Sequence, residues 1–178
     1  DATLEHARAC AKLGLHGYRV NEYPAGAELL SEEHYLEFVF PYKKRLFTGI
    51  KEAGLVTILE YLGWVEPRLP HFAKLDIDCL QTESSRKNYR NDVAQYRAVL
   101  GEEVCILGNS PILQVIEQGD EEAWRAEVLK QARGIGDQHR YMVCAGSPTT
   151  WATKPARLRE FGEYMRDALG ELAPPNRA

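Results

Sequence analysis

The sequence has no run of about 18 apolar residues, the length from which a membrane-spanning helix is built. It also has no signal-peptide pattern, no low-complexity segment and no basic cluster larger than Lys43-Lys44-Arg45. These absences argue against a membrane protein, a secreted protein and a nucleic-acid-binding protein. We therefore expect a cytoplasmic protein that interacts with neither membranes nor nucleic acid.

Closely spaced cysteines are missing as well, since no Cys-x-x-Cys pair occurs. Disulfide frameworks and zinc ribbons both need such spacing, so neither is expected. The isolated cysteines lie in apolar settings and are interpreted as reduced residues of the core. They are Cys10, Cys79, Cys105 and Cys144.

The 178 residues include 44% hydrophobic and 27% charged residues and carry a net charge of -4, which is typical of one soluble globular domain. The chain begins at Asp1 rather than at methionine, which indicates a fragment or a processed product.

Apolar stretches that suit buried strands alternate with amphipathic stretches that suit helices. Strands are expected over residues 17–22, 55–62, 77–82, 104–107 and 141–145. Helices are expected over 3–13, 31–53, 68–75 and 89–100, with further helices starting at Ile112, Glu121 and Pro155. Pro41 should kink the second helix. Such alternation predicts an α/β protein with a parallel sheet.

The stretch around Glu83 is the most informative one, because an apolar strand ends there in a carboxylate. Residues 84–88 are polar and are expected to cap a helix that begins near Tyr89. Ligands bind at the carboxyl ends of strands in proteins of this class. Four other polar side chains also follow strands, and one edge of a parallel sheet would gather all five. The five residues are Glu22, Glu60, Glu83, Asn109 and Ser147.

Glu22, Glu60 and Glu83 are the catalytic candidates. If the three carboxylates meet without cations, repulsion raises at least one pKa and suits general acid-base chemistry. They could equally hold Mg²⁺, which prefers oxygen ligands. The alternative is structural, because carboxylates at strand ends also cap helices or pair with lysine and arginine.

Substrate-binding candidates are Tyr61, Arg86, Asn109 and Ser147. Arg86 can bind a carboxylate or phosphate in a bidentate manner, or lie in solvent. Tyr61 and Trp64 can line a pocket or simply pack, and Asn109 can contact a ligand or serve a turn. The histidines, including His34 and His71, are interpreted as structural or exposed. Ser147 has no sequence neighbour that would activate it as a nucleophile.

Short motifs in the second half of the chain resemble those of a known family. Residues 107–111 (Leu-Gly-Asn-Ser-Pro), 116–122 and 155–158 are similar to the carboxyl half of the uroporphyrinogen decarboxylase family, which includes corrinoid-dependent methyltransferases. Residues 82–86 and 20–24 resemble the acidic strand ends of the related cobalamin-independent methionine synthases. The resemblance spans nearly all of residues 3–170.

The resemblance implies a TIM-type (β/α)8 barrel, to which this chain supplies about five strand-helix units, the fourth to the eighth. Residues 1–172 would form the carboxyl-terminal portion of one such domain, and 173–178 a loose tail. Five strands cannot close the barrel. We therefore expect a homo-oligomer or a missing amino-terminal half.

Zinc-using methyltransferases of this superfamily carry a His-x-Cys pair after the fifth strand and a further cysteine after the eighth. The matching positions here are Glu60 and Leu62, then Gly146 or Ser147. The resemblance therefore argues against zinc in the usual site, and any metal would depend on Glu22, Glu60 and Glu83.

The function implied is a corrinoid-linked methyltransferase of one-carbon metabolism, with a small-molecule substrate and a corrinoid protein as partner. The three glutamates would position the methyl donor or acceptor. One alternative is a decarboxylase of a tetrapyrrole or a small carboxylic acid. Another is a non-catalytic half-barrel that binds a partner chain, which the missing thiol ligands and the low strand count favour.

Overall fold

The computed structural model describes residues 2–136, 140–146 and 149–172. Its centre is a five-stranded sheet in which all strands are parallel and neighbours follow chain order. The strands are β1 (Gly17–Glu22), β2 (Val56–Tyr61), β3 (Cys79–Thr82), β4 (Cys105–Leu107) and β5 (Tyr141–Met142). The predicted α/β class and parallel sheet are thereby confirmed.

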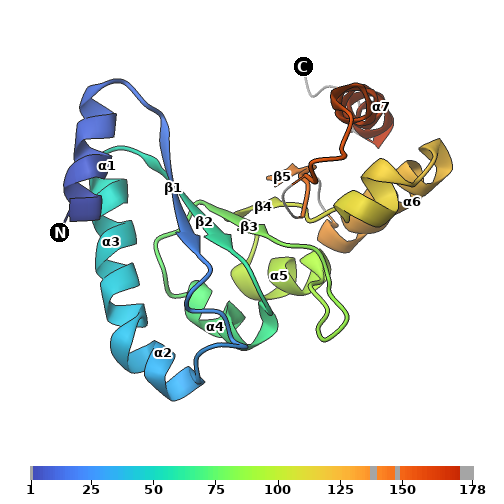
Figure 1. The fold of residues 1–178 in the computed structure, drawn as a ribbon. Helices are drawn as coiled ribbons and strands as arrows, with labels where there is room; N and C mark the ends of the chain where they lie inside the picture. The colour runs from blue at the N-terminus through green and yellow to red at the C-terminus, as the bar shows by residue number, and fades with distance from the viewer. Residues whose placement is uncertain (1, 137–139, 147–148, 173–178) are drawn as a thin grey trace.

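The helices follow one another around the outer side of this sheet, from α1 and α3 at one end to α6 and α7 at the other (Figure 1). They are α1 (Ala2–Lys12), α2 (Glu32–Phe38), α3 (Phe40–Glu52), α4 (Leu69–Phe72), α5 (Val93–Leu100), α6 (Glu121–Ile135) and α7 (Pro155–Leu172). A 3-10 turn (Glu66–Arg68) precedes α4, and a π-helical segment (Ile112–Glu117) precedes α6.

Strand β2 shows that only one face of the sheet is fully covered. Its alternate residues Thr57, Leu59 and Tyr61 are completely buried under the helices. On the other face Val56 is 44% exposed and Ile58 is half-buried. We call this second face the inner face, because it corresponds to the interior of a barrel. The arrangement is a partial barrel.

The inner face continues across the next strands. In β3 and β4 the helix-facing Leu80 and Ile106 are fully buried, whereas Cys79 and Cys105 on the inner face are only half-buried. All four cysteines of the chain are free, as expected, but none lies in the fully buried core. The inner face is therefore only half covered, and it carries both apolar side chains and polar ones such as Glu60.

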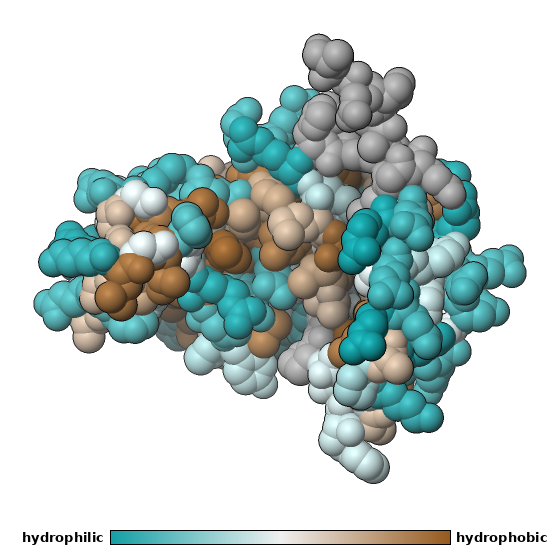
Figure 2. All heavy atoms as spheres, turned by 90° about the horizontal axis from the view of Figure 1, so that it is seen from above, coloured by the Kyte–Doolittle hydropathy of each residue, from teal (hydrophilic) through white to brown (hydrophobic). Residues whose placement is uncertain are grey.

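Most of the buried side chains belong to one core between the sheet and α1 to α5. A smaller cluster joins the π-helical segment to α6 and α7 through Trp124, Val128 and Phe161. Figure 2, which views the molecule from above, also shows brown hydrophobic surface at its left and through its middle.

Among the residues described, no helix is both long and apolar enough to cross a bilayer.

Three sequence expectations need correction or refinement. The long helix expected over residues 31–53 is two helices that meet at Val39, because Pro41 cannot donate the main-chain hydrogen bond that would join them. Helix α5 starts at Val93 rather than near Tyr89, and its cap is Asp92, whose carboxylate accepts from the main-chain N–H of Ala94. Strand β5 ends at Met142, whereas the sequence predicted a strand that continues to residue 145.

Glu22 does not face the carboxyl-edge crevice, as the sequence analysis expected. It is 1% exposed and lies on the helix-covered face, laterally paired with Tyr61. Lys43 Nζ of α3 lies 3.1 Å from Glu22 Oε2. Burial nevertheless raises the pKa of Glu22, although Lys43 partly offsets this. The side chain at the end of β1 is thus part of the packing between sheet and helices.

One-sided burial predicts unequal costs for truncations along β2. Leu59→Ala removes a fully buried side chain and should lower the free energy of unfolding by about 2–5 kcal/mol. Val56→Ala, on the inner face of the same strand, should cost about 1 kcal/mol or less. Urea denaturation of both variants measures this difference. Equal losses would mean that the inner face is covered in solution.

The raised pKa of Glu22 predicts a pH-dependent penalty. Because the folded protein holds this proton more tightly than the unfolded chain does, the contribution of Glu22 to stability falls as pH rises above 4.5. Glu22→Gln should therefore gain stability relative to the wild type between about pH 4 and pH 7, beyond a constant offset from the unpaired Lys43. Thermal denaturation across this range tests it. The exposed Glu103→Gln is the control, and a pH-independent difference for Glu22→Gln would contradict the prediction.

Candidate functional site

Two pockets lie side by side at the carboxyl ends of the strands and share Leu62 as a lining residue. The Glu83 pocket has a volume of about 300 Å³ and is lined by Tyr23, Gly26, Glu28, Leu29, Leu62, Gly63, Glu83, Arg86 and Tyr89. The Glu60 pocket has a volume of about 320 Å³ and is lined by Arg19, Glu60, Leu62, Gln81, Thr82, Cys144, Ala145 and Gly146. Both are large enough for a small-molecule ligand.

The carboxylate of Glu83 is held from two sides. Oε2 accepts from Arg86 Nε at 2.8 Å and from Arg86 Nη2 at 2.6 Å, while Oε1 accepts a short hydrogen bond from the hydroxyl of Tyr89. Burial, together with the charge of Glu83, raises the pKa of Tyr89, so its hydroxyl remains a donor. Glu83 is 6% exposed, whereas the side chain of Arg86 is 59% exposed. The guanidinium thus keeps donors free for a ligand.

Glu60 carries its own partners on the inner face. Its Oε2 accepts from Asn21 Nδ2 at 3.0 Å, and Arg19 Nη1 lies 3.4 Å from Oε1. The thiol of Cys144 lines the same pocket and accepts from Gln81 Nε2 at 3.4 Å. Burial raises the pKa of Cys144, and the charge of Glu60 adds to this. Cys144 is therefore a thiol, not a thiolate, at neutral pH.

The sheet brings two of the three predicted carboxylates to the pockets. Glu60 and Glu83 line adjoining pockets, but Glu22 lies on the opposite face of the sheet. Each carboxylate also has a cation beside it, which is Arg19 for Glu60 and Arg86 for Glu83. The expected convergence of all three acids is wrong for Glu22, because successive residues of a strand point to opposite faces.

Tyr61 was a candidate for substrate contact, but its side chain is fully buried on the helix face. Its hydroxyl accepts from the main-chain N–H of Ala27 at 2.9 Å, and its ring packs against Phe72. Burial raises the pKa of Tyr61 to about 12. Trp64 is 37% exposed beside the Glu83 pocket, and its main-chain N–H donates to Glu28 Oε1.

Asn109 is 5% exposed, and its amide donates to the main-chain carbonyls of Glu83 and Asn91. These bonds are internal to the protein, and Asn109 lines neither the Glu83 pocket nor the Glu60 pocket. Ser147 lies outside the described residues. His71 is buried and bonds to Glu32, whereas His34 is exposed on α2, in agreement with their structural interpretation.

Several lining residues were not predicted from the sequence, among them Glu28, Gln81, Tyr89 and Cys144. Glu28 lies in the loop after β1, where no periodic pattern exists to place it. Tyr89 was assigned to a helix stripe. Cys144 was interpreted as core, although its position near the end of the expected strand over residues 141–145 was available as a signal.

The residues present do not fit the zinc site of the zinc-using methyltransferases in this superfamily. Leu62 offers no donor, and a side chain at Gly146 has no room, since its Cβ would lie 2.5 Å from Ser84 N and closer still to Asn109 O. Across the described ranges, no three His, Cys, Asp or Glu side chains are grouped to hold a metal ion. Neither zinc nor magnesium chemistry is therefore assigned to these residues.

Comparisons with known proteins identify a matching family and two similar methyltransferases. The model of the family described as uroporphyrinogen decarboxylase (URO-D) matches residues 1–168. A methylated-thiol–coenzyme M methyltransferase from Methanosarcina mazei is 28% identical over 161 residues, which cover 90% of this chain and 40% of that protein.

A solved structure of a methyltransferase from Methanosarcina mazei has the same fold, with a TM-score of 0.76 at 18% identity. The match covers 93% of this chain and 46% of the other. The chain thus spans less than half the length of both relatives. The strand ends, the pockets and the match over residues 1–168 lead to one conclusion: this chain belongs to the uroporphyrinogen decarboxylase family.

Proposed function

We propose that this chain is the carboxyl-terminal half of a cytoplasmic methyltransferase that moves a methyl group between a small molecule and a thiol or corrinoid acceptor. The observation that carries the proposal is the pair of adjoining pockets, one with Glu83 and Arg86 and the other with Glu60. Support comes from the similarity to a methyltransferase whose name specifies methylated thiols and coenzyme M.

In the proposed reaction, the carbon–sulfur bond of the donor breaks as the methyl group bonds to the incoming nucleophile, and the donor sulfur leaves as a thiolate that takes up a proton. Arg86 and Tyr89 bind the polar end of the substrate beside Glu83, which orients it towards Leu62. A thiol acceptor must lose its proton before it attacks. Glu60 is the carboxylate that lines the second pocket and can receive that proton.

A corrinoid protein is the proposed methyl carrier and partner. Tyr23 is 59% exposed and Leu29 is 63% exposed, and both line the Glu83 pocket. Exposed apolar side chains at the mouth of a pocket favour docking of another protein. The outer edges of β1 and β5 pair with no further strand among the described residues, and they are proposed to be covered by further polypeptide of the same protein or by a second copy.

Decarboxylation of a small carboxylic acid is the second candidate, and a specific observation favours it. Arg86 lines the Glu83 pocket with an exposed guanidinium that can bind a carboxylate in a bidentate manner. Release of CO2 from candidate acids, without methyl transfer, would favour this candidate. Ligand binding without either reaction would favour a non-catalytic half-barrel.

Glu83→Gln should reduce methyl transfer by on the order of 100-fold, because the neutral amide no longer anchors Arg86. The assay follows ¹³C-methyl NMR signals from a labelled methylated thiol, with coenzyme M or cob(I)alamin as acceptor, in the full-length protein. The exposed Glu103→Gln serves as the control, with activity unchanged. Full activity in Glu83→Gln would refute the role of this carboxylate.

The close approach at Gly146 predicts that no side chain is tolerated there. Gly146→Ala should lower the free energy of unfolding by about 1–3 kcal/mol, because the new Cβ collides with main-chain atoms of Ser84 and Asn109. Gly162→Ala, within α7 and with no atom within 4 Å of the added Cβ, should be neutral or stabilising. Chemical denaturation compares the two. A tolerated Gly146→Ala would reopen this position to the cysteine that the family resemblance implies.

A further inference from the structure

We infer that Asn91 and Asn109 form an amide clamp that positions Glu83 for catalysis. Each side-chain amide donates to the main-chain carbonyl oxygen of Glu83, at 3.1 Å from Asn91 and 3.2 Å from Asn109. The catalytic consequence rests on the proposed function, whereas the positioning itself does not. Neither residue lines the Glu83 pocket or the Glu60 pocket, so both act on the site through Glu83.

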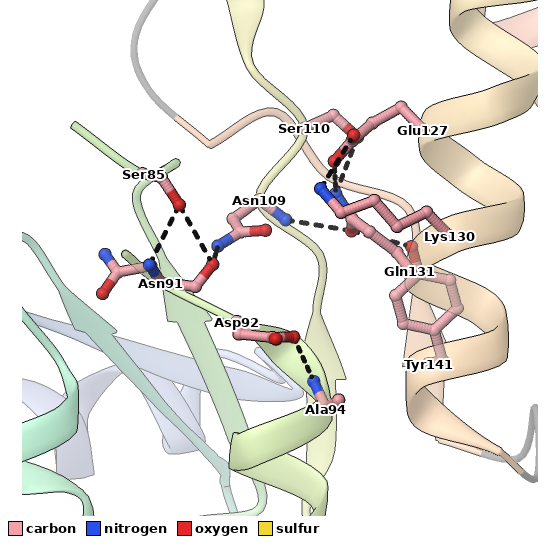
Figure 3. A network of polar contacts seen from close by, with 10 residues as sticks. All are labelled: Ser85, Asn91, Asp92, Ala94, Asn109, Ser110, Glu127, Lys130, Gln131 and Tyr141. Atoms are coloured by element: carbon pink, nitrogen blue, oxygen red, sulfur yellow. Dashed lines mark hydrogen bonds and ion pairs between the residues drawn. The ribbon is translucent and has the colours of Figure 1, made fainter. Parts of the chain in front are cut away.

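Asn109 reaches the carbonyl from the end of β4. Its Nδ2 also donates to the main-chain oxygen of Asn91 at 3.1 Å, so that one amide links two loops (Figure 3). Its own main-chain N–H donates to Gln131 Oε1 of α6, which also accepts from the hydroxyl of Tyr141. Asn109 is thus anchored to the helix layer behind it.

Asn91 reaches the same carbonyl from the loop before α5. Its Nδ2 also donates to the main-chain oxygen of Gly63 at 2.9 Å, and its Oδ1 accepts from the N–H of Val65 at 3.1 Å. Its main-chain N–H donates to Ser85 Oγ (Figure 3). This one side chain therefore ties the loop after β2 to the loop after β3.

The peptide group that follows Glu83 is held on both sides. Its carbonyl oxygen accepts from the two amides, and its N–H, which belongs to Ser84, donates to the oxygen of Gly146 at 2.7 Å. A fixed peptide plane fixes the direction in which the Glu83 side chain leaves the backbone. Arg86 and Tyr89 then need only hold the carboxylate itself.

Burial makes the clamp specific to asparagine. Asn91 is 6% exposed and Asn109 is 5% exposed, so removing either amide leaves the carbonyl of Glu83 with one donor fewer in a largely buried setting. An aspartate would place a carboxylate oxygen against the carbonyl oxygens of Glu83 and Asn91, where a donor is required. The clamp therefore needs amide nitrogens at both positions.

Fluorine NMR of the full-length protein labelled with 3-fluorotyrosine reports on the clamp without any activity assay. The Tyr89 resonance, assigned by its loss in Tyr89→Phe, senses the hydrogen bond to Glu83. We expect Asn109→Ala to shift and broaden this resonance and to lower kcat by on the order of ten- to a hundredfold. Asn91→Ala, where it folds, should shift the same resonance.

Thr57→Val is the matched control, because it also removes a buried side-chain hydrogen bond but lies at the start of β2. It should leave the Tyr89 resonance and kcat unchanged. An unchanged Tyr89 resonance in Asn109→Ala would overturn the clamp, and so would equal shifts in Asn109→Ala and Thr57→Val. If the wild type transfers no methyl group, the proposed function fails, yet the resonance still decides whether the clamp exists.

Discussion

The parallel, sequential order of the five strands is the constraint on which the site depends. It delivers the carboxyl end of each strand, and the loop that follows, to one edge of the sheet. Main-chain hydrogen bonds then connect these loops, since Ser84 N–H donates to Gly146 O and Gly146 N–H donates to Ser110 O. A single reversed strand would remove one wall of the pockets.

Because helices cover only one side of the sheet, its two faces differ in burial. The helix face holds the fully buried residues, while the inner face leaves Val56 and Met142 exposed. Partial burial of polar groups on this half-covered face is tolerated because the groups pair with one another, as Glu60 does with Arg19 and Asn21. The Glu60 pocket is therefore a product of the open inner face, and its final shape depends on whatever covers that face.

The apolar runs of the sequence predicted the five strands and, except for β5, their carboxyl ends to within one residue, because a buried parallel strand has a continuous hydrophobic signature. They could not tell which face a terminal side chain occupies. Glu22 and Glu60 both lie near strand ends, yet a shift of one residue in register places them on opposite faces. Loop residues such as Glu28 and Tyr89 escaped because their positions depend on tertiary contacts, and the role of Asn109 depends on a carbonyl 26 residues away.

The two pockets are structurally linked, because the residue that they share is connected through its neighbour to Glu83 by hydrogen bonds. Leu62 is that residue, and the neighbouring Gly63 accepts a hydrogen bond from Asn91, which also holds the carbonyl of Glu83. Any movement of the loop after β2 therefore pulls on the loop after β3. In the proposed methyl transfer, this coupling would hold the two ligands at a defined separation, which a direct displacement at carbon requires.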